Sequence, residues 1–187
     1  MQESRGQQLR SAPRKGYGHN PSVGILLSQV VPERVGWLWQ GRIPKGKLTF
    51  VDGDPGTGKS AMITDLAARV SGGRTMPDGT KGSAAAGVMI LSAEDGLADT
   101  IRPRVDAAGG DPSMIVGLTP DDGPTGDRLL SLPEDIPVIE QGVEDVAAGL
   151  VIIDPLVTCF GSKIDSHRDQ DVRRVLAARP WQRPACL

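Results

Sequence analysis

The chain has 187 residues, of which 39% are hydrophobic and 24% charged, and its formal net charge is −2. This size and composition suit one globular domain with a core of its own, and the near-neutral charge gives no overall basic surface of the kind that binds nucleic acid. No apolar stretch approaches the roughly 18 residues of a membrane span, so we expect no membrane partner. The two cysteines, Cys159 and Cys186, lack the spacing of a metal site. We therefore expect a cytoplasmic protein with free thiols.

The first 22 residues are polar and rich in Gly, Gln, Ser and Pro. We predict a disordered tail over residues 1–22, and its excess of basic over acidic side chains leaves a basic arm for nucleic acid as the alternative. The chain becomes apolar from Gly24 onwards. We therefore expect a folded core over residues 23–178, followed by an irregular tail over residues 179–187.

Residues 53–60 read Gly-Asp-Pro-Gly-Thr-Gly-Lys-Ser and match the phosphate-binding pattern G-x-x-x-x-G-K-[ST]. The apolar and β-branched run 47–51 before this loop predicts a strand. The run 61–70 after it predicts a helix. Strand, glycine-rich loop and helix form the context that distinguishes a true phosphate-binding loop (P-loop) from a chance match.

Each part of this loop has a physical role in binding phosphate. Glycines let backbone N–H groups converge on phosphate oxygens, and the helix that follows adds its unpaired N–H groups and its positive dipole end. Lys59 would reach the β- and γ-phosphates, and Ser60 would offer its hydroxyl to Mg²⁺. We expect ATP or ADP with Mg²⁺ to bind at Gly53, Asp54, Pro55, Gly56, Thr57, Gly58, Lys59, Ser60 and Ala61.

Further strands and helices alternate along the rest of the core. A loop is expected over residues 71–86 and an acidic turn over 121–127. Alternation of this kind implies right-handed βαβ units, hence an α/β fold with a mainly parallel sheet and flanking helices, whose ligands bind beyond the carboxyl ends of the strands. The sequence predicts strands at 87–92, 114–116 and 150–154, and helices at 99–108, from 133 or 135 to 148, and at 169–178.

Two of the predicted strands end in acidic residues. Leu150-Val151-Ile152-Ile153 is followed by Asp154, which we expect to bind Mg²⁺ directly or through water as the second half of a Mg²⁺-nucleotide site. The alternative for Asp154 is a turn or a helix cap.

The other acidic strand end is Ser92-Ala93-Glu94-Asp95. A carboxylate there could take the proton of the water that attacks the γ-phosphate, and we choose Glu94 for this role. We expect Asp95 to support Glu94 or to cap the next helix.

These motifs together resemble the AAA family ATPases of the RecA-like superfamily, and especially the group related to plasmid hexameric replicative helicases of the RepA type. The similarity covers residues 30–176. It implies a RecA-like P-loop core that uses ATP and Mg²⁺, Glu94 and Lys59 as catalytic residues, and a homo-oligomeric ring around single-stranded DNA. The residues that carry it are Trp37-Leu38-Trp39, Pro44-Lys45-Gly46-Lys47, the loop 53–60, Ser92-Ala93-Glu94-Asp95 and Ile153-Asp154-Pro155-Leu156.

The C-terminal end departs from this pattern. Relatives continue with another apolar strand that ends in a polar sensor, commonly His, whereas this chain has Pro180 and Pro184 there, and His167 does not match the sensor position. Because proline cannot extend a helix or build a buried strand, we expect the sheet to be incomplete on its C-terminal side, with an unpaired edge. Phosphate binding does not depend on that strand, but hydrolysis, ring closure and DNA translocation do.

The leading hypothesis is therefore an ATP-binding ATPase, the motor core of a helicase that acts in DNA replication or recombination of a mobile element. One alternative is a nucleotide-binding remnant, or a subunit that joins longer partners without hydrolysing ATP. A small-molecule kinase is less favoured, because such kinases usually lack a glutamate like Glu94 after the neighbouring strand.

Overall fold

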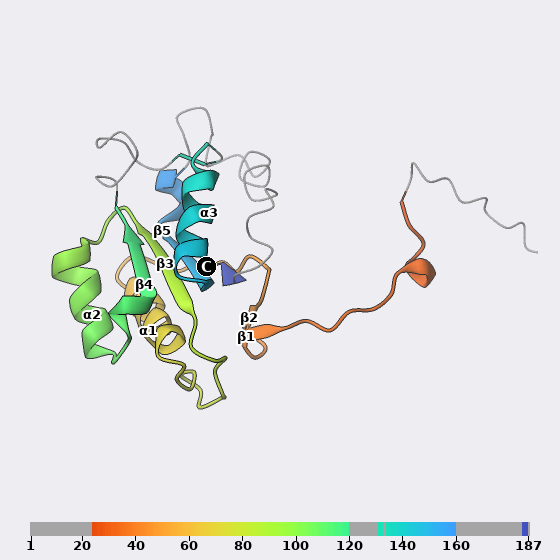
Figure 1. Cartoon of the computed structure of the whole chain (residues 1–187), viewed down its shortest axis with the longest axis horizontal. Coiled ribbons are helices and arrows are strands. Elements are labelled where there is room, and N and C mark those ends of the chain that lie inside the picture. The colour runs from red at the N-terminus through yellow and green to blue at the C-terminus, as the bar shows by residue number, and fades with distance from the viewer. Residues whose placement is uncertain (1–23, 120–130, 133, 160–184, 187) are drawn as a thin grey trace, which may run out of the picture. The chain divides into compact units, whose positions relative to one another are not determined.

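A computed structural model of the chain describes residues 24–119, 131–132, 134–159 and 185–186 (Figure 1). The chain divides into two compact units, Met1–Arg34 and Val35–Leu187. Some of the predicted features lie outside the described residues, namely the tail 1–22, the turn 121–127, the helix 169–178 and His167. Within the described residues, no helix is long and apolar enough to cross a membrane.

The described part of the first unit exposes most of its large apolar side chains. It contains one short 3-10 helix, η1 (Leu27–Gln29), between residues with extended backbone. We call residues 25–31 the apolar arm. The exposed large hydrophobic residues of this arm are Ile25, Leu26, Leu27, Val30 and Val31.

The second unit is built on a parallel sheet. Its strand order is β4 (Ile115–Leu118), β3 (Gly87–Ser92), β5 (Ala148–Asp154) and β6 (Ala185–Cys186), with β3 and β5 at the centre. All six residues of β3 are buried, as expected for a continuous apolar run covered on both faces.

Helices cover both faces of this sheet (Figure 1). Side chains alternate between the faces, so Ile90 and Ile152 pack with α1 (Lys59–Ser71) and α2 (Arg102–Ala107), whereas Met89 and Val151 pack with α3 (Ile136–Asp145). The prediction of an α/β fold with a parallel sheet and flanking helices is confirmed. The predicted helix 135–148 is too long, because α3 ends at Asp145 and β5 begins at Ala148.

The predicted strand before the P-loop is wrong. Over residues 47–51 only Leu48 makes a β-bridge, and the Phe50 side chain is 62% exposed. An apolar, β-branched run becomes a strand only where a neighbouring strand pairs with its backbone. On the side of β5 that faces away from β3, the neighbouring strand is β6 and not residues 47–51. The chain instead approaches the loop through an antiparallel hairpin of β1 (Trp37–Trp39) and β2 (Ile43–Pro44), which the sequence analysis did not predict.

The expected unpaired edge beside β5 is also wrong. Ala185 pairs with Leu150 and Cys186 with Val151, so β6 lies parallel to β5. Proline removes only its own backbone donor, and two residues that follow Pro184 are enough to form this short pairing at a sheet edge.

The β1–β2 hairpin is tied to the loop before β3 through Asp78. Trp39 Nε1 donates to Asp78 Oδ2 at 2.9 Å, and the backbone N–H and hydroxyl of Thr80 donate to Asp78 Oδ1 at 3.1 and 2.7 Å. Arg42 lies 5.0 Å above the Trp39 ring and 3.6 Å from Asp78. The hydrogen bonds from the Thr80 hydroxyl and from Trp39 lower the pKa of Asp78 to about 2.

This shift predicts how the stability of the hairpin depends on pH. Because the pKa of Asp78 is lower in the folded than in the unfolded chain, its contribution is complete above about pH 4 and is lost as the pH falls towards 2. We expect Asp78→Asn to lack this pH-dependent contribution to the free energy of unfolding. The difference in stability between the wild type and Asp78→Asn should therefore shrink as the pH falls from 5 to 2.5. Urea unfolding at several pH values measures it, and a difference that stays constant over this range would contradict the prediction.

Candidate functional site

The loop 53–60 turns into α1 through two glycines in the left-handed region. Gly56 has a φ of 77°, and Gly58, the residue that precedes the helix, has a φ of 87°. A Cβ at either position would meet nothing within 4 Å, so the backbone conformation, not the space around it, requires glycine here. Residues 52–58 are exposed, and the loop is therefore open to a ligand from solvent.

Lys59, the first residue of α1, folds back over this loop. Its Nζ donates to the carbonyl oxygens of Gly53 at 2.6 Å and Asp54 at 2.9 Å. The first turn of α1 carries no acidic residue and its N-terminus has no side-chain cap. An ammonium group and unpaired helix N–H groups thus lie together, which is the arrangement that binds an anion.

The N-terminus of α1 lies at the carboxyl end of the sheet. Ala86, just before β3, donates its backbone N–H to the Val70 carbonyl near the end of α1 at 3.1 Å. From this junction the helix packs back along β3 and β5. Its 13 residues span about 20 Å, and the six residues of β3 span about the same length. The phosphate-binding loop is therefore level with the residues that follow the strands.

The two predicted acidic residues come together at this end of the sheet. Ser92 is the register partner of Asp154, and the backbone N–H of Ala93 donates to the Asp154 carbonyl at 3.1 Å. Glu94 is therefore two residues beyond the position that pairs with Asp154. Sequence reasoning predicted this neighbourhood from parallel strands alone.

The structure separates the roles of Glu94 and Asp95. Asp95 Oδ2 accepts from Arg104 Nη1 at 2.7 Å, and its backbone N–H donates to the Ser92 hydroxyl at 3.1 Å. Glu94 is exposed, and its carboxylate has no hydrogen bond or ion pair within the described residues. Glu94 is thus available to a ligand, whereas Asp95 connects the strand end to α2.

The sequence analysis did not predict a role for Arg104, and it left two roles open for Asp95, support of Glu94 or capping of the next helix. The helical segment after Asp95 begins with the π-helical turn η2 (Leu97–Ile101), whose N-terminus has no side-chain cap, so Asp95 is not a capping residue. The only sequence signal for the ion pair is a basic residue on the next helix, nine positions further on, and such spacing is too common to identify a partner.

Comparison with known families gives a match over most of the chain. The model of a family described as an AAA domain matches residues 20–183. Among curated proteins no match was found.

Proposed function

The chain belongs to the AAA domain family of nucleotide-binding ATPases, and on this premise we propose that it binds ATP and ADP with Mg²⁺ at residues 53–61 and hydrolyses ATP with Glu94 as general base. The observation that carries the proposal is the open phosphate-binding loop, with Lys59 over it, at the same end of the sheet as Glu94 and Asp154.

Phosphate binding requires only a small rearrangement of Lys59. Its ammonium already lies over the loop on two carbonyl oxygens, and phosphate oxygens would replace these as charged acceptors. The free N–H groups at the start of α1 point toward the same anion. Lys59 therefore acts on the bound nucleotide before any chemistry takes place.

The residues that we expect near Mg²⁺ fit an ion that arrives with the nucleotide. The Ser60 hydroxyl and the Asp154 carboxylate are oxygen donors without hydrogen-bond partners in the described part of the chain. The same part contains no group of three His, Cys, Asp or Glu residues that could hold a metal. Mg²⁺ commonly binds through one or two protein oxygens together with phosphate oxygens and water, and Ser60 and Asp154 suit that mode. When bound, it would neutralise charge on the phosphates.

In hydrolysis, Glu94 would accept the proton of the attacking water. The water oxygen forms a bond to the γ-phosphorus, the bond from that phosphorus to the bridging oxygen breaks, and ADP carries the electron pair away. Asp95 is a poor candidate for this role, because Arg104 holds its carboxylate. General-base catalysis of this kind typically contributes a factor of about 10²–10⁴ in rate.

The finer proposal concerns what hydrolysis drives. The resemblance to RepA-type hexameric helicases supports a motor core that acts on single-stranded DNA as a homo-oligomeric ring in the replication or recombination of a mobile element. The alternative is a nucleotide-binding subunit or remnant without its own turnover. A small-molecule kinase would instead leave Glu94 without a function.

ATP turnover with and without single-stranded DNA tests these functions. We expect turnover that rises several-fold when the DNA is added and that disappears in Lys59→Ala. Turnover that DNA does not change would contradict the motor proposal but uphold the ATPase. Nucleotide binding without turnover under either condition would overturn the ATPase proposal in favour of the non-hydrolysing subunit.

A further inference from the structure

The turn that carries Glu94 is bridged by the buried hydroxyl of Ser92. Ser92 is 5% exposed, and its hydroxyl donates to the Asp95 carbonyl oxygen at 2.9 Å. The same hydroxyl oxygen accepts the backbone N–H of Asp95 at 3.1 Å. A hydroxyl has one donor and two acceptor positions, so both hydrogen bonds can exist together. One side chain thus satisfies both backbone groups of the residue that follows Glu94.

The backbone on the other side of Glu94 is attached to the strand that ends in Asp154. The Ala93 N–H donates to the Asp154 carbonyl oxygen at 3.1 Å, and Ser92 is the register partner of Asp154. Hydrogen bonds to the backbone therefore flank Glu94 on both sides, at Ala93 and at Asp95. The Glu94 carboxylate itself is exposed and has no partner within the described residues. Its position consequently depends on the turn that carries it.

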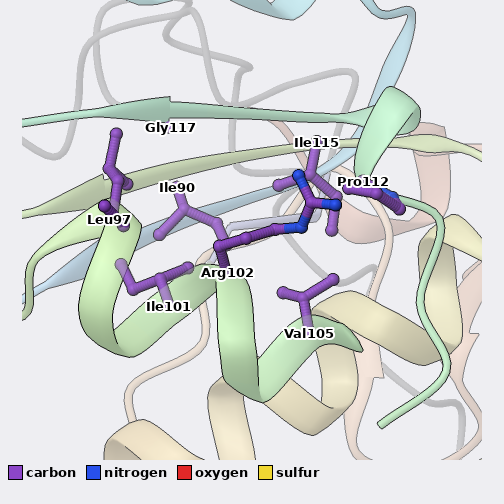
Figure 2. A pocket seen from close by; sticks show the side chains of 9 residues that line it. Ile90, Leu97, Ile101, Arg102, Val105, Pro112, Ile115 and Gly117 are labelled. Atoms are coloured by element: carbon purple, nitrogen blue, oxygen red, sulfur yellow. The ribbon is translucent and has the colours of Figure 1, made fainter. Parts of the chain in front are cut away.

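Packing of the segment after the turn does not fix the turn by itself. Leu97 and Ile101 of η2 line an apolar pocket of about 490 Å³ together with Ile90 of β3, and Figure 2 shows these side chains around it. Protein interiors are otherwise close-packed, so a pocket of this size beside η2 leaves the position of η2 less constrained on that side. The conformation of the turn must therefore be fixed by contacts within it.

The ion pair between Asp95 and Arg104 is the weaker of the two side-chain contacts in the turn. The two side chains are 31% and 42% exposed, and solvent screens a pair of this kind so that it contributes little to stability. The hydrogen bonds of a buried hydroxyl are costly to lose, because water cannot readily replace it as a partner. The turn therefore depends chiefly on Ser92.

We propose that Ser92 is a positioning residue for ATP hydrolysis, which holds Glu94 where it can accept the proton of the attacking water. This role rests on the proposed function of Glu94. A misplacement of about 1 Å can cost a factor of about 10² in rate, so loss of the hydroxyl should slow the chemical step without weakening ATP binding. Asp95→Asn leaves this arrangement in place, because Ser92 bonds only to the backbone of Asp95.

Steady-state kinetics of the whole chain with ATP and Mg²⁺ test this role. We expect Ser92→Ala to lower kcat about 10–100-fold, with KM for ATP nearly unchanged. Ser71→Ala is the matched control, because Ser71 is 2% exposed and its hydroxyl likewise bonds one backbone carbonyl and one N–H, those of Ala68 and Asp111. Ser71 ends α1, away from the phosphate-binding loop. An equal loss of kcat in the two variants, or wild-type kcat in Ser92→Ala, would overturn the positioning role.

A double variant separates positioning of Glu94 from a general loss of structure. In the Glu94→Gln background, Ser92→Ala should cause no further loss of turnover, because the base that Ser92 positions is already absent. The same fold-loss in both backgrounds would contradict the proposal. Ser92→Cys serves if Ser92→Ala does not fold, since a thiol fills a similar space but is only a weak donor and acceptor. We expect Ser92→Cys to lower kcat as well, and wild-type kcat in this variant would overturn the proposal.

Hydrogen exchange without nucleotide tests the hold of Ser92 on the turn. In Ser92→Ala the Asp95 amide should exchange with solvent about ten-fold faster than in the wild type, because it has lost its acceptor. Equal exchange in the two proteins would overturn the positioning role and leave the proposed function intact. Wild-type turnover in Glu94→Gln, or a wild type without turnover, would instead overturn the proposed function and the positioning role with it.

Discussion

Lys59→Ala should weaken ATP binding ten-fold or more. The substitution removes a charge-assisted contact to the phosphates, which is worth about 1.5–3 kcal/mol, and about 1.4 kcal/mol corresponds to a factor of ten. We expect the fold to tolerate the change, because within the described residues the hydrogen bonds of the Lys59 ammonium go to two exposed loop carbonyls, those of Gly53 and Asp54. Calorimetric titration with ATP and Mg²⁺ measures the affinity of both proteins.

Lys47→Ala is the matched control for this experiment. Lys47 is an exposed lysine that lies six residues before the loop 53–60, and its loss changes the net charge by the same amount as the loss of Lys59. We expect it to bind ATP like the wild type. Equal affinities of the wild type and Lys59→Ala for ATP would contradict the nucleotide-binding proposal. An equal loss of affinity in Lys59→Ala and Lys47→Ala would show that the effect comes from the change in net charge and not from a contact of Lys59 with the phosphates.

Glu94→Gln should lower ATP turnover by about 10²–10⁴-fold and leave ATP binding nearly unchanged. Glutamine has the shape of glutamate but is a far weaker base, so the change removes proton transfer in the transition state without removing a ground-state contact. Because Glu94 is exposed and has no partner within the described residues, the substitution should not disturb the fold. Single-turnover rates and equilibrium binding measured on the same samples separate the two effects.

Asp95→Asn and Asp154→Asn are the comparisons that make this test specific. Asp95→Asn weakens an ion pair with Arg104 at the protein surface, so we expect a small change in turnover. Asp154→Asn should mainly weaken binding of ATP with Mg²⁺. If Asp95→Asn abolishes turnover while Glu94→Gln retains it, the wrong carboxylate has been assigned. If neither substitution affects turnover, this strand end has no catalytic role.

The central strands and the P-loop could be predicted because local patterns determine them. β3 and β5 are short apolar runs without polar interruption, and the parallel alternation with helices brings their carboxyl ends together, so Glu94 and Asp154 could be placed near each other from the sequence. The glycines of the loop follow from the backbone conformation that Gly56 and Gly58 adopt.

The remaining features depend on contacts between segments far apart in the sequence. Residues 47–51 have the composition of a strand, yet their pairing depends on which segment lies beside β5, and β6 lies there. The hydrogen bond from Trp39 to Asp78 joins segments 39 positions apart, and no local pattern marks it. The same holds for Arg104, whose partner is visible only once α2 is placed against the strand end.

The central position of β3 also has a consequence for synthesis on the ribosome. β3 is buried along its whole length, but Met89 pairs with Val116 on one side and with Val151 on the other, so its second neighbour is made roughly sixty residues later. At typical elongation rates of about 5–20 residues per second, the nascent chain carries this apolar segment without its full set of neighbours for about 3–12 s. The speed of translation therefore sets how long β3 is open to mispairing, and slower decoding between residues 92 and 148 would lengthen that interval.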